Sequence, residues 1–286
     1  MPMCRFVAYK GSQLLMSDLL LGSSQSLIRQ SYQARERKEP LNGDGFGVGW
    51  YTDGVDPTPG LFTSVQPAWG NRNLSRLAPK IASTCFFAHV RAASKGSPVT
   101  ELNCHPFQYK QFLWMHNGRI ANFKRIKRRL REPLSDPFYD CILGTTDSEH
   151  AFALFLENLG PNLENYSIHN LEAALVATIK ALDEFTIAAP SDEPSHYNFA
   201  VTDGQSMLAT RYISDAEKTP ETLYLAKGSR LETQGGQYQM ITSDAAIQTV
   251  VIASEPLTDI QKDWEPLPAN HMVSVSADFD VRISAI

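Results

Sequence analysis

The chain has 286 residues and a formal net charge of −5 at pH 7, with 26 Lys and Arg against 31 Asp and Glu. Its pI is about 5.8 and its mean hydropathy is −0.25. This acidic balance argues against nucleic acid or an anionic membrane as a partner. No apolar run approaches the roughly 20 residues that span a bilayer, and the first residues lack the pattern of a signal peptide.

The cysteines are widely spaced and form no Cys-x-x-Cys pair: Cys4, Cys85, Cys104 and Cys141. This usage is typical of a reduced protein, so we expect a cytoplasmic location. The length suffices for one large core or two small ones. Because no Pro-, Gly- or Ser-rich linker divides the chain, we expect residues 4–286 to form a single domain. Residues 1–3 are expected to be removed or to precede the true start.

β-prone apolar runs predict strands along most of the chain, at 5–10, 45–51, 85–90, 112–116, 198–202, 206–212, 221–226, 248–253 and 271–276. Between Gly45 and Tyr51, glycine alternates with large apolar residues. This alternation indicates that another backbone closely covers one face of that strand. Residues 53–60 and 187–195 are rich in Pro, Gly or acidic residues and are predicted to be loops.

Two helices have clear signals. Thr146-Asp147-Ser148-Glu149 is a T-x-x-E capping box before the apolar run 151–159, and Gly160 ends it. Residues 167–185 place apolar side chains on one helical stripe. Many strands with a few central helices favour an α+β fold in which helices cover antiparallel sheets, and argue against a βαβ repeat.

Seven of residues 119–131 are Arg or Lys, with apolar residues at helical spacing. This pattern predicts a solvated amphipathic helix. The alternative is a surface for an acidic ligand or partner.

Cys4 is the strongest candidate for a catalytic residue. A cysteine at a chain terminus carries a thiol and a free α-amine, and the amine titrates near about pH 7.7–8.0. One residue can then supply both nucleophile and base. The alternative is an ordinary cysteine that lies near the terminus by chance.

Three further candidates could bind a substrate or its transition state. In His116-Asn117-Gly118, the Asn117 amide and the Gly118 N–H can form an oxyanion hole, although Asn-Gly is also a common turn. Arg91 follows an apolar strand and suits bidentate capture of a carboxylate, or a surface salt bridge. Asp147, in the first turn of its helix, can stabilise that helix or face a substrate ammonium.

We expect no metal ion and no cofactor. Cys104 and His105 are adjacent, but no second pair stands at the spacing of zinc ligands. His89, His105 and His116 are therefore interpreted as structural hydrogen-bonding residues.

Each of these signals is weak alone, but their order along the chain is specific. It resembles the class II glutamine amidotransferases, which are N-terminal-nucleophile hydrolases with an αββα sandwich of two antiparallel sheets between helical layers. The motifs that carry the resemblance are Cys4, Asn42-Gly43-Asp44-Gly45-Phe46-Gly47, Arg91, Asn103 to Pro106, His116-Asn117-Gly118 and Thr146 to Glu149. The likeness is greatest to a stand-alone branch that includes the amidotransferase-like subunit of the fungal glutathione-degrading complex and, next, the amidohydrolase of ergothioneine biosynthesis.

The resemblance implies a role for each candidate. Cys4 would be the nucleophile and its amine the base, and Asn117 and Gly118 would form the oxyanion hole. Arg91 would hold the α-carboxylate of a γ-glutamyl group, and Asp147 its α-ammonium.

The chain departs from the family pattern in two places. Pro2 and Met3 stand between the initiator and Cys4, so removal of Met1 alone would leave no free amine on Cys4. Ala92 and Lys95 stand where many relatives carry Trp and His.

The expected function is hydrolysis of the γ-glutamyl amide of glutathione or a related compound through a thioester. A peptidase-like or acceptor-enzyme subunit is a possible partner. The alternatives are a glutaminase subunit that gives ammonia to another enzyme, the ergothioneine-pathway hydrolase, and a catalytically silent γ-glutamyl-binding or scaffold protein.

Overall fold

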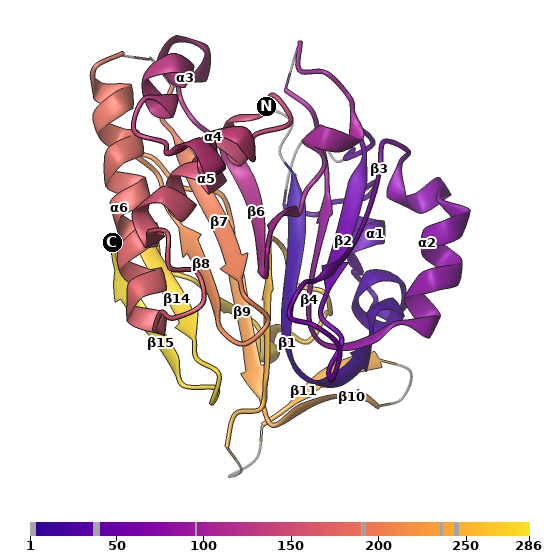
Figure 1. Ribbon diagram of the computed structural model, residues 1–286. Coiled ribbons are helices and arrows are strands. Elements are labelled where there is room, and N and C mark those ends of the chain that lie inside the picture. The colour runs from indigo at the N-terminus through magenta and orange to yellow at the C-terminus, as the bar shows by residue number, and fades with distance from the viewer. Residues whose placement is uncertain are drawn as a thin grey trace.

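The computed structural model describes residues 4–36, 41–94, 96–189, 191, 193–234, 237–242 and 246–286. Two antiparallel sheets lie face to face, with helices on the outer side of each (Figure 1). The helices are α1 (Leu27–Gln30), α2 (Arg72–Leu77), α3 (Phe123–Arg131), α4 (Asp136–Asp140), α5 (Asp147–Leu159) and α6 (Ile168–Ile187).

One sheet has the strand order β13-β9-β12-β1-β4-β2-β3. Its strands are β1 (Arg5–Leu15), β2 (Phe46–Trp50), β3 (Gly60–Ser64), β4 (Ala82–Val90), β9 (Tyr224–Gly228), β12 (Thr249–Ala253) and β13 (Glu265–Pro266). The other has the order β15-β14-β8-β7-β6-β5. Its strands are β5 (Phe107–Tyr109), β6 (Phe112–Arg119), β7 (His196–Thr202), β8 (Met207–Arg211), β14 (His271–Val275) and β15 (Val281–Ala285). A separate hairpin joins β10 (Arg230–Gln234) to β11 (Gln237–Ile241).

Alternating side chains of the strands fill three hydrophobic layers. In β4, Phe86 and Ala88 face the layer under α1 and α2, whereas Cys85 and Phe87 face the layer between the sheets. In β6 of the second sheet, Trp114 faces away from the layer between the sheets and packs against α5 and α6. Because both faces of each sheet are covered, the central strands are apolar on both faces. This arrangement confirms the predicted αββα sandwich.

The two predicted helices are present and begin as the sequence indicates. The Thr146 side chain accepts a hydrogen bond from Glu149 N at the start of α5, and Gly160 ends this helix at φ +92°. The Glu149 carboxylate accepts hydrogen bonds from Leu143 N and Gly144 N, so it anchors the preceding loop. Ser167 and Asn170 form a full capping box at α6. The basic segment forms α3, with Ile126 and Leu130 buried.

All nine predicted strands are present, but several of their boundaries differ. β1 continues to Leu15 and β6 continues through Asn117 and Gly118 to Arg119. The predicted strand 112–116 therefore ended three residues too early, because the ladder with β7 continues in register to Arg119. The prediction did not include α1, α2, α4, β3, β5, β10, β11, β13 or β15. These missed elements have at most six residues each, too short for a periodic pattern.

Within the described residues, no helix is both long and apolar enough to cross a membrane.

Gly47 in β2 shows why glycines alternate in this strand. A Cβ at this position would lie 2.2 Å from His105 O, a backbone atom with little freedom to move. The predicted close approach of another backbone is therefore confirmed, and it fixes the segment that precedes β5 against the first sheet.

Gly47→Ala is expected to lower the free energy of unfolding by about 1–3 kcal/mol, because the added methyl group overlaps a carbonyl oxygen. Gly70→Ala is the matched control, since nothing lies within 4 Å of a Cβ there. That variant should stay within about 0.5 kcal/mol of the unchanged protein. Urea unfolding measures both. Equal stability of the two variants would contradict the close approach.

Candidate active site

The predicted site residues come from both sheets and meet at one end of the sandwich. Cys4 directly precedes β1 and Arg91 directly follows β4, and these strands pair Arg5 with Val90. Asn117 and Gly118 lie near the end of β6. Asp147, the first residue of α5, accepts a hydrogen bond from Ile120 N just after β6. Residues far apart in sequence are thus collected by antiparallel pairing.

Cys4 is partly buried against the segment that follows β4. Its Sγ accepts a hydrogen bond from Ala92 N at 3.5 Å and lies 3.7 Å from Ala92 O. Burial raises the pKa of the Cys4 thiol, whereas the Ala92 N–H and the charges of Arg91 and Arg5 oppose that rise. The carboxylate of Asp147 raises this pKa further. A thiol with a raised pKa needs a base to become a nucleophile.

Arg91 is 3% exposed and is held by two loops. Its guanidinium donates hydrogen bonds to Asp44 O, Ser97 Oγ and Pro98 O, at 3.2–3.4 Å. None of these three acceptors is a carboxylate, so a surface salt bridge does not explain its position. A buried guanidinium that has no carboxylate partner among the described residues is suited to binding an anion.

Asn117 lies on the face of β6 that faces the other sheet. Its Nδ2 donates to Ser254 Oγ at 3.3 Å, and its buried Oδ1 has no hydrogen-bond partner among the described residues. The next position, Gly118, has no room for a side chain, because a Cβ there would lie 2.0 Å from His196 O. An Asn-Gly turn, the alternative interpretation, is excluded because both residues belong to β6.

Asp147 lies in the first turn of α5, as predicted, and links this helix to the residue that follows β6. Its Oδ1 accepts from Ser148 N at 2.9 Å, and its Oδ2 accepts from Ile120 N at 2.8 Å. These bonds orient the carboxylate between α5 and the end of β6. A carboxylate has about four acceptor positions, so it can still accept from a cation.

Three buried histidines lie beneath this end of the sandwich. The rings of His89 and His105 stack with centroids 4.1 Å apart, and His89 Nε2 lies 3.2 Å from His116 O. His116 itself contacts Ser148 Oγ and His196 O, each at 2.9 Å. Burial lowers the pKa of all three, that of His89 to about 3. They are therefore neutral near pH 7. His89 and His116 form hydrogen bonds as predicted, whereas neither ring nitrogen of His105 has a partner among the described residues, so its prediction as a hydrogen-bonding residue was wrong.

Ser254 and Glu255 were not predicted as part of the site. Ser254 Oγ accepts from Phe6 N at 3.0 Å as well as from Asn117. Glu255 forms a buried ion pair with Arg5 at 2.7 Å, and Arg5 also donates to Cys4 O. The sequence alone does not show that these residues lie beside Arg5, because 250 positions separate Glu255 from it.

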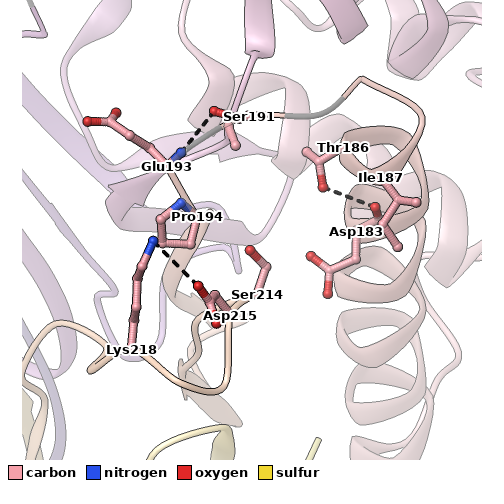
Figure 2. Close-up of a pocket in the computed structure, with 10 residues that line it drawn as sticks. Asp183, Thr186, Ile187, Ser191, Glu193, Pro194, Ser214, Asp215 and Lys218 are labelled. Atoms are coloured by element: carbon pink, nitrogen blue, oxygen red, sulfur yellow. Dashed lines mark hydrogen bonds and ion pairs between the residues drawn. The ribbon is translucent and has the colours of Figure 1, made fainter.

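A cavity of about 260 Å³ lies away from these residues, between the end of α6 and the loops around Glu193 and Asp215. Figure 2 shows the Asp183 carboxylate pointing into it and Lys218 paired with Asp215. None of the predicted site residues lines this cavity, so it does not form part of the candidate site. Across the residues described, no cluster of three or more His, Cys, Asp or Glu could hold a metal ion.

Residues 12–283 match the family model of the class-II glutamine amidotransferases. The chain therefore belongs to this family of enzymes, as the order of its motifs predicted.

Several curated proteins are similar over 96% of this chain. One is the probable glutamine amidotransferase DUG3 of Saccharomyces cerevisiae, 41% identical over 82% of its own length. Another is the gamma-glutamyl-hercynylcysteine sulfoxide hydrolase of Mycolicibacterium smegmatis, 29% identical over 96% of its length. Among solved structures, a class-II glutamine aminotransferase domain protein of Silicibacter pomeroyi is 25% identical, with a TM-score of 0.67 over 99% of both chains.

The buried histidines predict how stability depends on pH. His89 stays neutral in the folded protein down to about pH 3, whereas an unfolded histidine takes up a proton near pH 6.5. Below pH 6.5 the unfolded state binds more protons, so stability falls as the pH falls. In His89→Gln this loss should be smaller by roughly 1.4 kcal/mol per pH unit between pH 6 and 4.

Urea unfolding at several pH values gives this slope for the unchanged protein and the variant. His271→Gln is the control, because it removes a histidine that is only partly buried. Equal slopes in the His89 variant and the unchanged protein would show that His89 takes up its proton over the same pH range in the folded protein as in the unfolded chain.

Proposed function

We propose that the protein is a γ-glutamyl amidohydrolase that uses Cys4 as nucleophile, and that residues 4–286 form its single catalytic domain. Its substrate is glutathione or a related γ-glutamyl compound. The observation that carries this proposal is the meeting of Cys4, Arg91, Asn117 and Asp147 at one end of a class-II amidotransferase fold.

The proposed site binds the two charged groups of a γ-glutamyl unit separately. Arg91 takes the α-carboxylate and Asp147 the α-ammonium. The γ-carbonyl then lies at Cys4, with its oxygen facing the Asn117 amide and the Gly118 N–H. This arrangement places developing negative charge beside fixed donors, which is the largest source of acceleration in acyl transfer.

The proposed reaction has two steps. The Cys4 α-amine takes the thiol proton while sulfur bonds to the carbonyl carbon of the γ-amide, and the same proton goes to the departing amine as the C–N bond breaks. A γ-glutamyl thioester remains. Water then gives a proton to the α-amine and attacks the thioester carbonyl; the C–S bond breaks, the α-amine returns the proton to sulfur, and glutamate is released. Burial raises the pKa of the thiol, so a neighbouring base is required.

The free amine requires that the chain begin at Cys4, and we propose that translation starts at Met3, whose removal exposes it. We also propose that the enzyme acts in the reducing cytoplasm, where its four cysteines remain free thiols. A peptidase-like subunit is the proposed partner, from the resemblance to the glutathione-degrading subunit. A second candidate substrate is a γ-glutamyl sulfoxide, because the mycobacterial relative is named as a hydrolase of one.

The test is glutamate release by protein that begins at Cys4, with glutathione, glutamine and a γ-glutamyl sulfoxide, with and without extract of its host. We expect turnover of glutathione, slower turnover of glutamine, and none by the Cys4→Ala variant. Protein that retains Pro2 should be inactive. Preference for glutamine would favour a glutaminase subunit. No turnover of any compound would favour a γ-glutamyl-binding or scaffold protein.

Asn117→Ala should lower kcat about 10²–10³-fold with a smaller effect on KM, since the donor acts mainly on the transition state. Asn198→Ala is a matched control. Asn198 is a buried asparagine directly opposite on β7, and its Nδ2 donates to Glu221 O and Thr222 O. That variant should keep kcat within about 3-fold, a difference of under 1 kcal/mol. Equal loss in both variants would argue against an oxyanion hole at Asn117.

Arg91→Lys should raise KM roughly 10- to 100-fold, because an ammonium cannot reproduce the bidentate hydrogen bonds of a guanidinium. Arg76→Lys, on the exposed face of α2, is the control and should leave KM unchanged. Steady-state kinetics with the best substrate measure both. A normal KM in Arg91→Lys would mean that another group binds the α-carboxylate.

A further inference from the structure

One hydroxyl joins the strand of the nucleophile to the side chain of the proposed oxyanion hole. Ser254 Oγ accepts hydrogen bonds from Phe6 N at 3.0 Å and from Asn117 Nδ2 at 3.3 Å. Phe6 is two residues beyond Cys4 on the first sheet, whereas Asn117 lies on the second. Ser254 is 1% exposed. The contact is therefore a buried polar link between two sheets whose interface is otherwise largely apolar.

Ser254 is itself held firmly. Its N–H donates to Phe6 O at 3.1 Å, so it exchanges two hydrogen bonds with that residue. Its carbonyl accepts from Thr222 Oγ1 at 2.9 Å. The next residue, Glu255, pairs with Arg5 on the opposite face of β1. Ser254 therefore binds the main chain of Phe6, and Glu255 binds the side chain of Arg5, so both hold the start of β1 in place.

We propose that Ser254 is a positioning residue that sets the distance and orientation of the Asn117 amide relative to Cys4. This inference rests on the proposed function. An Nδ2 group has two hydrogens. Ser254 takes one, so the amide cannot rotate and the second hydrogen keeps a fixed direction. The hydroxyl therefore acts through Asn117 and does not bind substrate itself.

The arrangement has a physical advantage over packing alone. A free asparagine side chain between two sheets could turn its Oδ1 toward the developing oxyanion, which would be repulsive. In the structure Ser254 Oγ accepts from Asn117 Nδ2, and this hydrogen bond holds the orientation in which Nδ2 lies on that side. A misplacement of about 1 Å near reacting groups can cost about 10²-fold in rate.

The test compares Ser254→Ala with Ser83→Ala in protein that begins at Cys4. Ser83 is also a buried serine on the first sheet, but it lies at the opposite end of β4 and donates to Tyr51 O and Cys85 O. We expect Ser254→Ala to lower kcat about 10- to 100-fold with KM within about 3-fold. Ser83→Ala should keep its kcat within about 3-fold.

A double-mutant cycle distinguishes positioning from general damage to the fold. If Ser254 acts through Asn117, Ser254→Ala should lower kcat by no more than about 3-fold when Asn117→Ala is already present. Equal losses in both backgrounds would overturn the proposal, as would normal kcat in Ser254→Ala alone.

A second measurement does not depend on turnover. The side-chain amide resonances of Asn117, assigned by their absence in Asn117→Ala, should shift and exchange faster with water in Ser254→Ala but not in Ser83→Ala. If no γ-glutamyl compound is turned over, the proposed function fails while this result still decides whether Ser254 holds Asn117. Should Ser254→Ala not fold, exchange of these protons in the unchanged protein as fast as in the exposed Asn73 would overturn the proposal.

Discussion

The buried ion pair between Arg5 and Glu255 is the interaction on which the geometry of this end of the molecule depends. Both side chains are almost fully buried, and removal of either member of such a pair would leave an uncompensated charge in the interior. Here Arg5 also donates to Cys4 O, and Glu255 also accepts from Arg35 N. The pair therefore fixes the carbonyl next to the thiol, and it brings the segment after β12 against the start of β1.

The sequence was sufficient to predict the architecture because the long elements carry strong periodic signals. α5 and α6 combine a capping residue with an apolar stripe, and both begin within a residue or so of the expected position. Short elements such as α1 and β13 were not predictable, since they owe their conformation to the sheet beside them. The end of β6 was misplaced for a related reason: Asn and Gly disfavour strands, but pairing with β7 overrides that preference.

The candidate site was predictable only in part. Cys4, Arg91, Asn117 and Asp147 were singled out because each has chemistry suited to acyl transfer. Their grouping came from family resemblance. The hydrogen bonds that collect them use main-chain groups such as Asp44 O and Ile120 N, whose positions no sequence pattern shows. Ser254 is a common residue in an ordinary position of the sequence. Its importance is visible only from its two donors, which are more than 100 positions apart.

The central place of β1 has a consequence for synthesis. This strand is made before its partner β12, and before Ser254 and Glu255, which bind Phe6 and Arg5 at its start. Pairing over such a separation is slow and comes late in folding. One edge of β1 therefore stays without its partner strand until β12 has been made. The start of β1, next to Cys4, therefore acquires its final buried surroundings only after Ser254 and Glu255 have been made.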